Sequence, residues 1–534
     1  MQKLRITVVD LVTKGPTSRL YNRVMNANLA SIMPQAIAVW CEELGHAVRY
    51  ICYTGAEDLV GEVSEGTDVL FVGAFTRSAQ TAYALSNLSR CNGAVTVLGG
   101  PHARCYPQDA AKYFDYVLGF TDKNLIADLL SDPAAQRPRG VELKTARQPM
   151  EMPSLRERWK FVAPTLAKAP FLKIVPMIGS MGCPYTCSFC IDSVVPYQPL
   201  PFDQVRDDLR FLQTRMRRPR VGWHDPNFGV RFDDYMDVIE SAVRPGQVRF
   251  VAESSLSLLS EEHVKRLKHN GFDALLPGIE SWYDLGNKSK TGARVGVEKV
   301  RQVADHVNMI LRHVPYVQTN FVLGLDCDEG AEPFELTKQF LDLAPGAYPA
   351  FSLLTSYGQA APLNLELQRA GRVLPFPFHF LDSNHAMNVR PLNYGWAEFY
   401  DHAVDLTRYA LQGSRVGRRF RANRGITTRL HNWLRAVTSN RAAYQAKIRA
   451  LLDTDREVRR FIHGETTVLP KFYEDKIRRS LGPLWDALPE GAVMHDQNAY
   501  LNSQSGLLPA VDGPRSRRVP VAVPSLQPSP SALS

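Results

Sequence analysis

The residues of this chain best suited to chemistry are three cysteines with a fixed spacing. Cys183, Cys187 and Cys190 form a C-x-x-x-C-x-x-C run. Gly182 precedes the first cysteine and Pro184 follows it, which favours a loop over the middle of a helix. Three thiolates are one too few for a closed four-ligand metal site. If they hold a [4Fe-4S] cluster, one iron keeps an open position for a small molecule, as a catalytic site requires.

Two other interpretations of the same cysteines stay open. The spacing i, i+4, i+7 would also place three small apolar side chains on one face of a helix. A remote histidine could also complete a zinc site with the three thiolates. The zinc alternative describes a scaffold and not an enzyme, and elemental analysis would find zinc without iron in a colourless protein.

A short buried strand is predicted for residues 174–178, directly before the cysteines. With Phe189 before the last cysteine, the motif resembles the radical S-adenosylmethionine (SAM) enzymes. The resemblance implies that the three thiolates bind a [4Fe-4S] cluster, that SAM chelates the fourth iron, and that Phe189 lies at the SAM site. An electron from a donor such as flavodoxin or ferredoxin would then cleave SAM to a 5'-deoxyadenosyl radical, which takes a hydrogen atom from the substrate.

Residues 1–135 alternate between short apolar strands and helices, which predicts a doubly wound, flavodoxin-like parallel sheet. Ligands bind such sheets at the carboxyl ends of the strands, and several of these ends carry glycine. The predicted strands are 6–9, 48–52, 69–72, 95–98 and 116–118, and the predicted helices are 31–44, 79–90, 107–113 and 124–130.

The stretch 97–102, with the sequence V-L-G-G-P-H, is followed by Pro107 and by residues 115–117. Together they resemble the cobalamin-binding domain that precedes many radical SAM cores. The resemblance implies that strand-end residues contact cobalamin. These residues are Gly73, Thr76, Gly99, Gly100, Pro101, His102 and Gly119.

Two departures from that pattern bear on how cobalamin would bind. Asp10 is present after the first strand, but Val12 stands where the Asp-x-His-x-x-Gly motif has its cobalt-ligating histidine. A binding mode without a histidine ligand is therefore implied. The usual Gly-Glu-Gly-Glu is replaced by residues 119–122, G-F-T-D. An empty, purely structural domain is the alternative, and His102 is expected to begin a helix or to line the pocket for the cobalamin tail, not to bind cobalt.

Residues 136–170 have the composition of a linker, and residues 171–365 again alternate strand and helix. Each strand there is followed by polar residues, which predicts a partial (β/α)6 barrel with its chemistry at the carboxyl ends of the strands. The predicted strands after the cysteine loop are 221–224, 248–252, 274–276, 317–323 and 349–354.

The resemblance assigns these strand ends to SAM, beginning with the segment 225–228, D-P-N-F. Residues 356–360 depart from the Pro-Tyr-Pro-Gly-Thr turn of the family. The implied SAM contacts are Phe189, Asp225, Asn227, Glu253, Ser255, Glu280, Ser281, Asn320 and Gly324. General acids and bases are not assigned; Tyr185, Tyr197, Tyr357 and His224 are candidates by position alone.

Residues 366–511 are predicted to be mostly helical and to cap the barrel with substrate contacts, and 512–534 to be a disordered tail. Five arginines cluster between Arg415 and Arg424. They favour a solvated helix connection, with an anionic-substrate or RNA patch as the alternative. The predicted helices are 396–411, 428–437, 441–452, 455–462 and 473–481.

The composition predicts a cytoplasmic protein that does not span a membrane. The net charge of +9 is small for 534 residues and does not favour nucleic acid. The N-terminus has no signal-peptide pattern, and no apolar run reaches the length of a membrane span. The other cysteines lack disulfide spacing and are predicted to be free thiols in a reduced compartment, which suits an iron–sulfur cluster.

The combined resemblance implies a cobalamin-dependent radical SAM enzyme. The expected reaction is methylation of an unactivated carbon of a small molecule, such as a natural product or a lipid, through a 5'-deoxyadenosyl radical and methylcobalamin. A non-methylating cyclisation or rearrangement on the same architecture is the first alternative. An RNA-modifying enzyme is the second, but the chain lacks a second cysteine triad and a β-rich C-terminal region.

Overall fold

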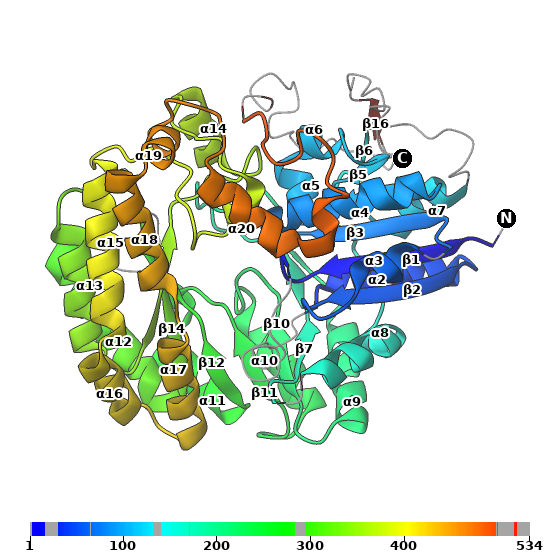
Figure 1. The fold of residues 1–534 in the computed structure, drawn as a ribbon. Coiled ribbons are helices and arrows are strands. Elements are labelled where there is room, and N and C mark those ends of the chain that lie inside the picture. Colours follow the sequence, from blue (N-terminus) through cyan, green and yellow to red (C-terminus); the bar gives the residue numbers. More distant parts are fainter. Residues whose placement is uncertain are drawn as a thin grey trace.

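The chain folds around two parallel sheets that lie side by side, with a helical region along the second (Figure 1). The computed structural model describes residues 3–15, 30–64, 66–131, 140–169, 171–283, 294–497, 499 and 517–520. Of the expected tail 512–534, only β16 (Arg517–Pro520) falls within them, and the rest lies outside the described residues.

The N-terminal sheet has six parallel strands in the order β2-β1-β3-β4-β5-β6, and β16 pairs antiparallel with β6 at its edge. Helices cover both faces, with separate apolar cores around Trp40 on one face and Tyr83 on the other. This confirms the doubly wound sheet. The strands are β1 (Arg5–Leu11), β2 (Ala47–Tyr53), β3 (Val69–Ala74), β4 (Val95–Gly99), β5 (Tyr116–Leu118) and β6 (Val141–Lys144).

The helices of this half agree with the predicted ones, with additions. The predicted helix 107–113 is shorter, and α5 and α3 were not predicted. The helical elements are α2 (Ile32–Glu43), α3 (Leu59–Ser64), η1 (Thr76–Ser78), α4 (Ala79–Cys91), α5 (Pro101–Cys105), α6 (Pro107–Ala110) and α7 (Lys123–Ser131).

The segment 136–170 is not a linker where the structure describes it. Strand β6 completes the N-terminal sheet, and helix α8 (Leu155–Lys168) packs against α2 and α9. Ser154 and Glu157 form a capping box at the start of α8. Its buried Arg158 donates to Gln35 of α2 at 2.8 Å. The polar composition of this segment gave no sign of a short strand and one amphipathic helix.

The second sheet is a partial barrel of parallel strands in the order β7-β10-β11-β12-β14-β15, and β13 also pairs with β14. The expected partial barrel is thus confirmed. Its strands are β7 (Ile174–Met177), β10 (Arg220–Trp223), β11 (Arg249–Ala252), β12 (Phe272–Leu275), β13 (Gly278–Glu280), β14 (Tyr316–Leu323) and β15 (Tyr348–Leu353), with the short pair β8 (Ser180–Met181) and β9 (Gln198–Pro199) in the cysteine loop.

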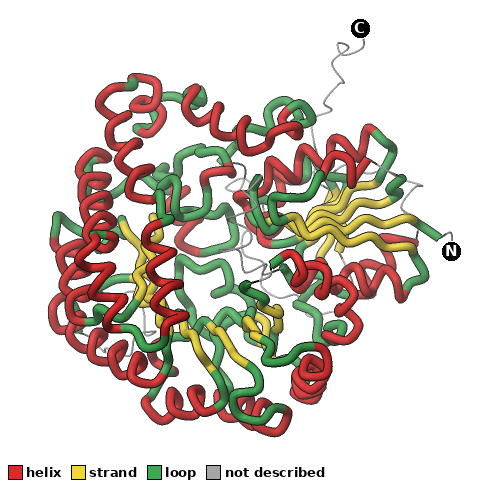
Figure 2. Tube along the Cα trace, turned by 60° about the horizontal axis from the view of Figure 1, so that its bottom comes forward, coloured by secondary structure: helices red, strands yellow, loops and turns green. Residues whose placement is uncertain are grey.

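Helices alternate with these strands and lie on the outside of the barrel, as Figure 2 shows in red around the yellow strands. Each buries an apolar stripe, for example Val300, Val303 and Val307 of α12. The helical elements are α9 (Phe202–Arg215), α10 (Phe232–Ala242), η2 (Leu256–Leu258), α11 (Glu261–His269), α12 (Gly296–His313), α13 (Glu332–Leu343) and α14 (Pro362–Arg369).

The C-terminal region is helical, as predicted, and returns to the N-terminal sheet. Ser480 of α20 donates to the Lys14 carbonyl after β1, and α20 runs toward α4 and α5 in Figure 1. Gln80 of α4 donates to the Val493 carbonyl at 2.9 Å. The elements are η4 (Phe378–Phe380), α15 (Trp396–Leu411), α16 (Gly413–Ala422), α17 (Ile426–Val437), α18 (Arg441–Thr454), α19 (Arg456–Ile462), α20 (Lys471–Leu481) and η5 (Gly482–Trp485).

The end of α5 joins the two sheets through the loop that follows β15. The Cys105 carbonyl accepts the amide of Gln359 at 3.0 Å, and the amide of Leu363 donates to the Ser188 carbonyl in the cysteine loop at 3.0 Å. Gly358 has a φ of +58°, and a Cβ there would lie 2.1 Å from the Cys105 oxygen. A glycine is therefore required where this loop touches α5.

We predict that Gly358→Ala lowers the free energy of unfolding by about 3 kcal/mol, because it adds a backbone clash to the cost of a left-handed residue. Gly371→Ala is the matched control, since Gly371 has a φ of +66° but a Cβ there would meet no atom within 4 Å. The control is expected to cost about 1 kcal/mol. Equal losses in urea unfolding of the two variants would contradict a tight contact between α5 and this loop.

Candidate active site

The three predicted cluster ligands lie on one loop at the carboxyl end of β7, between β8 and β9. Cys183 and Cys187 are buried and Cys190 is half-buried. The Cys183 amide donates to the Val195 carbonyl at 3.3 Å, and the Cys190 amide donates to the Cys187 carbonyl at 3.0 Å. A short, hydrogen-bonded segment therefore carries all three thiols.

The residue before the first thiol has to be glycine. Gly182 has a φ of +69°, and a Cβ would lie 2.3 Å from the Pro196 carbonyl oxygen. Within the part of the chain that the structure describes, no three His, Cys, Asp or Glu side chains are grouped to hold a metal ion. Thiolates on a [4Fe-4S] cluster bind different irons and need not converge on one point, so this donor set fits three irons of such a cluster.

Asp225, an expected SAM contact, uses its carboxylate to hold the start of the cysteine loop. Its Oδ2 accepts the Gly179 amide at 2.9 Å, and its Oδ1 accepts the Ser180 hydroxyl at 2.5 Å. Tyr235 donates to the Gly179 carbonyl at 2.5 Å. Burial raises the pKa of Asp225 to about 6, although these hydrogen bonds oppose the rise. The geometry makes Asp225 a support for the loop.

Asn227 and Ser255 are in contact, and each side chain has a polar atom without a hydrogen-bond partner among the described residues. The Ser255 amide donates to Asn227 Oδ1 at 2.8 Å. Both residues are buried, and among the described residues Asn227 Nδ2 and Ser255 Oγ have no hydrogen-bond partner. Unpaired buried polar atoms are costly and usually mark a missing ligand or water. This pair therefore fits a polar ligand at the carboxyl ends of β10 and β11.

Other expected SAM contacts also follow strands of the barrel. Glu253 is exposed, and its carbonyl accepts the Phe228 amide. Glu280 has a φ of +65°, which is unusual for a residue other than glycine and is often found at functional sites. Ser281 accepts the Tyr283 amide at 3.1 Å. These residues lie at the ends of β11 and β13, on the face where the cysteine loop follows β7.

Asn320 and Gly324 have clear structural roles. Asn320 Nδ2 lies 3.4 Å from the Leu276 carbonyl, and its Oδ1 accepts from Gln318. Gly324 has a φ of +86°, and a Cβ would come within 2.9 Å of the Phe399 ring on α15. The close approach of the helical region thus explains this glycine without a ligand. Phe189 is half-buried in the cysteine loop.

A cavity of about 780 Å³ lies between the N-terminal sheet and the cysteine loop. Its size is that of a small-molecule or cofactor site. Five of the seven expected cobalamin contacts line it, namely Gly73, Gly99, Gly100, Pro101 and Gly119, and the barrel side contributes Met181, Gly182, His224 and Pro226. The wall of one cavity therefore includes both the strand-end glycines and the residue next to Cys183.

The lining of this cavity fits a cobalamin without a histidine ligand. Val12 lines it after β1 and offers no donor atom. Among the described residues that line the cavity, His224 is the one histidine; it belongs to the barrel, and burial lowers its pKa to about 4. A Cβ on Gly99 would meet no atom within 4 Å, so the backbone there borders open space. The open space beside this glycine lets a large planar ligand approach the backbone closely.

Thr76 and His102 do not line the cavity. Thr76 is buried in the turn η1. His102 is fully buried, and its Nε2 lies 2.7 Å from the Tyr83 hydroxyl, which donates to Asp109 at 2.8 Å. Its ring meets Phe378 of η4 edge-on at 4.8 Å between centroids. Burial lowers the pKa of His102 to about 3, so the ring is neutral and serves packing between α5 and the C-terminal region.

Arg104 is a site residue that the sequence pattern did not reveal. It lines the cavity from α5 and donates to the Ile191 carbonyl at 2.8 Å, one residue after the last cluster cysteine. Its Nη1 also lies 3.6 Å from the Asp192 carboxylate. Arg104 therefore ties the cysteine loop to the N-terminal sheet across the cavity. No local signal distinguishes it from a surface arginine at a helix end.

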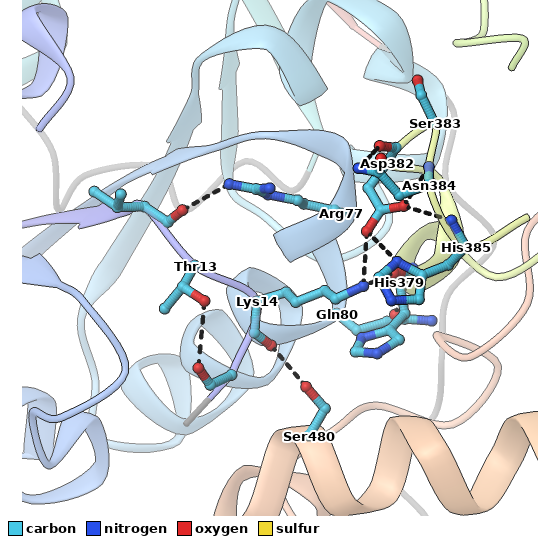
Figure 3. Close-up of polar contacts among 12 residues, drawn as sticks. Thr13, Lys14, Arg77, Gln80, His379, Asp382, Ser383, Asn384, His385 and Ser480 are labelled. Carbon is cyan, nitrogen blue, oxygen red and sulfur yellow. Dashed lines mark hydrogen bonds and ion pairs between the residues drawn. The ribbon is translucent and has the colours of Figure 1, made fainter. Parts of the chain in front are cut away.

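A half-buried polar cluster joins the N-terminal sheet to the C-terminal region (Figure 3). Lys14 donates to the His379 carbonyl at 2.9 Å and to Asp382 at 3.0 Å. Asp382 also accepts from His385 at 2.7 Å. Burial raises the pKa of Asp382, but His385 and Lys14 lower it more, so the pKa lies well below its usual value. The neighbouring Thr13 lines the cavity.

We predict that Cys183→Ser abolishes iron binding while Cys91→Ser keeps it. Cys91 is an exposed free thiol at the end of α4, outside the cysteine loop. After anaerobic reconstitution, the control should hold about four irons and the Cys183 variant fewer than about one. Full iron content in the Cys183 variant, or zinc in place of iron in the wild-type chain, would contradict a cluster at this loop.

We predict that Asp382→Asn lowers the free energy of unfolding by about 2 kcal/mol at pH 7, because it leaves the half-buried Lys14 without its anionic partner. A carboxyl whose folded-state pKa is depressed stabilises the fold above its unfolded pKa near 4 and loses that effect as pH falls. The difference from wild type should therefore persist from about pH 7 to 5 and shrink below about pH 4.

The matched control for this prediction is Asp405→Asn. Asp405 pairs with Lys338, but its side chain is 65% exposed. An exposed pair contributes about 1 kcal/mol or less, so urea unfolding should barely change. Equal losses at Asp382 and Asp405, or a loss at Asp382 that does not shrink in acid, would contradict the half-buried ion pair.

Known proteins resemble this chain in sequence. Residues 177–331 match the radical SAM superfamily. Bacteriochlorophyllide d C-12(1)-methyltransferase of Chlorobaculum tepidum is 23% identical over 419 residues, which cover 77% of this chain and 86% of the relative. Bacteriochlorophyllide d C-8(2)-methyltransferase of the same organism is 24% identical over 328 residues, covering 58% of this chain and 68% of the relative.

Solved structures share the fold. The cobalamin-dependent SAM radical enzyme OxsB with aqua-cobalamin bound has a TM-score of 0.54 at 12% identity, covering 91% of this chain and 80% of OxsB. The radical SAM methyltransferase TsrM of Kitasatospora setae has a TM-score of 0.50 at 14% identity, covering 73% of this chain and 79% of TsrM. With its cysteine loop and strand-end residues, the chain contains a radical SAM domain over residues 177–331 and shares the overall fold of cobalamin-dependent radical SAM enzymes of known structure.

Proposed function

We propose that this chain is a cobalamin-dependent radical SAM enzyme that transfers a methyl group to an unactivated carbon of a small organic substrate. The observation that carries the proposal is the single cavity that runs from the strand-end glycines to Gly182, beside Cys183. The names of the two relatives, both C-methyltransferases, support the same reaction class. Bound there, a [4Fe-4S] cluster with SAM would supply the radical and cobalamin would supply the methyl group.

The residues of the chain have separate tasks in this proposal. Cys183, Cys187 and Cys190 hold three irons, and Asp225 fixes the backbone that leads to them. Asn227 Nδ2 and Ser255 Oγ, which lack partners among the described residues, would bind polar groups of SAM. Holding a reactant in a fixed orientation accounts for a large part of enzymatic rate enhancement.

The cavity wall determines how the corrinoid would be held. Gly99 lets backbone approach the ligand, while Gly73 and Gly119 line the cavity with their missing Cβ atoms toward Pro34 and Lys144. Val12 provides no nitrogen to bind cobalt. Arg104 keeps the cysteine loop against this wall. We propose that a separate reductant protein supplies electrons and that the enzyme acts in a reduced, cytoplasmic compartment. Within the described residues, no helix has the length and apolar character of a membrane span.

The reaction is tested by incubating the reconstituted enzyme, a reductant and methyl-labelled SAM with an extract of host metabolites. The expected outcome is one small molecule that gains the labelled methyl group, with S-adenosylhomocysteine and 5'-deoxyadenosine formed in about equal amounts. If the substrate is changed but carries no label, and 5'-deoxyadenosine forms without S-adenosylhomocysteine, the reaction is a cyclisation or rearrangement and the proposed methylation is wrong.

We predict that Gly99→Leu removes cobalamin and keeps the cluster. A Cβ at this position would meet no atom within 4 Å, and Gly99 lines the cavity, so we expect a leucine there to occupy part of the cavity. Cobalt per chain should fall at least about tenfold while iron stays at about four, so SAM is still cleaved but no methyl is transferred. Gly413→Leu is the control, because its Cβ is equally unhindered and lies away from this cavity. Full cobalt content in the Gly99 variant would contradict the assignment of the cavity.

A further inference from the structure

Helix α17 carries an unusual row of apolar side chains on its outside. Ile426 is 62% exposed, Leu430 46%, Trp433 45% and Val437 55%. Their spacing of i, i+4, i+7 and i+11 places them on one helix face, which we call the α17 stripe. Of thirteen large apolar side chains that are exposed in the described residues, these four lie on this one helix. The row is therefore a contiguous patch and not a scatter of single residues.

The fold does not use the α17 stripe, because the opposite face of the helix makes the contacts with the barrel. Asn432 and Ala436 are buried. Arg435 donates to Gln318 on β14 at 2.6 Å, and its guanidinium lies 4.1 Å from the centre of the Tyr348 ring. Since Arg435 lies about half a turn from the stripe, the stripe points away from the barrel. In Figure 1, α16 and α17 form the lower corner of the helical region.

An apolar groove adjoins the stripe. A cavity of about 430 Å³ lies between α17, α16 and the end of α15. Trp433 and Val437 belong both to the stripe and to the groove, and Arg421 lies at the same groove. The other lining residues are mostly apolar or small, namely Leu411, Gly413, Val416, Gly417, Phe420 and Ala436. The apolar groove is thus continuous with the α17 stripe.

The charged side chains of the segment that contains α16 and α17 are all basic. Residues 406–452 contain ten arginines, one lysine and no carboxylate side chain. Arg415 and Arg418 pair with Asp342 of α13, and Arg419 is buried, so these three have structural roles. Arg421 is exposed and makes no ion pair with any described residue. The basic charge beside the stripe is therefore only partly neutralised.

We propose that α16 and the α17 stripe dock the protein on the surface of an anionic phospholipid membrane. A helix with aliphatic and tryptophan side chains on one face and arginines beside it lies in the interface between headgroups and acyl chains. Tryptophan prefers that depth, and each arginine near an anionic surface adds attraction. The docking is peripheral, since no helix of the described residues is built to cross a bilayer.

Two other occupants fit the same observations less well. RNA would pair with the arginines but would leave the aliphatic row in water, because bases stack on aromatic and guanidinium groups. A second copy of this chain, related by a twofold axis, would bring two basic surfaces together, and like charges across an interface oppose association. An anionic lipid surface satisfies both the apolar row and the charge.

The proposal is tested by sedimentation with phosphatidylcholine vesicles, with and without about one-third phosphatidylglycerol. The full chain should sediment with the anionic vesicles at low ionic strength, bind neutral vesicles much less, and dissociate as salt rises. The fluorescence of Trp433 should shift to shorter wavelength on binding. Trp433→Phe should lose the shift and keep the binding.

Leu430→Glu combined with Trp433→Glu should weaken binding to anionic vesicles by about tenfold or more, and Arg421→Glu by about tenfold. Val468→Glu is the matched control, because Val468 is 74% exposed and lies between α19 and α20, outside the α17 stripe. It should bind like the wild type. If the double variant unfolds, the Arg421 variant and the fluorescence of Trp433 in the wild type still test the proposal.

Three results would overturn the proposal. The first is no binding to anionic vesicles at low ionic strength. The second is salt-sensitive binding of single-stranded RNA with no vesicle binding. The third is self-association that the double variant abolishes, again with no vesicle binding. The proposal does not depend on methyl transfer, since vesicle binding needs neither cofactors nor substrate.

Discussion

The hydrogen bonds around the end of helix α5 are the constraint on which the candidate site depends. Arg104 reaches the Ile191 carbonyl of the cysteine loop, and the next residue, Cys105, accepts the Gln359 amide from the loop after β15. That loop in turn donates from Leu363 to Ser188, between two cluster cysteines. Three segments far apart in the sequence are thus joined at one point. They connect the N-terminal sheet to the cysteine loop, and Arg104 at this junction also lines the cavity between them.

Much of the fold could be predicted from the sequence, because alternating apolar strands and amphipathic helices have clear local periods. The three cysteines and the strand-end glycines were identified as candidates because their spacing is local. Roles that depend on distant partners could not be read in this way. Gly324 is a glycine because Phe399 packs against it, and Lys14 is half-buried against Asp382, which lies 368 residues later. Strand β6 was missed because a four-residue strand in a polar segment has almost no periodic pattern.

The arginine-rich stretch is a second case in which the roles of residues depend on partners distant in the sequence. From sequence, the arginines between Arg415 and Arg424 favoured a solvated connection. The structure places them on and after helix α16, where Arg419 lies against Tyr348 of the barrel and Arg418 pairs with Asp342. Part of the basic charge therefore anchors the helical region to the barrel. The remainder borders the α17 stripe, and only the folded arrangement reveals that charge and apolar surface coincide.

The central claim is that one cavity joins the N-terminal sheet to the cluster loop and holds the corrinoid. The most direct test is a crystal structure of the anaerobically reconstituted protein with anomalous data collected at the iron and cobalt absorption edges. The account predicts a cobalt peak between Gly99 and Gly119 and an iron peak at Cys183, Cys187 and Cys190. A cobalt peak elsewhere, or an ordered chain with iron at the loop and no cobalt in the cavity, would contradict it.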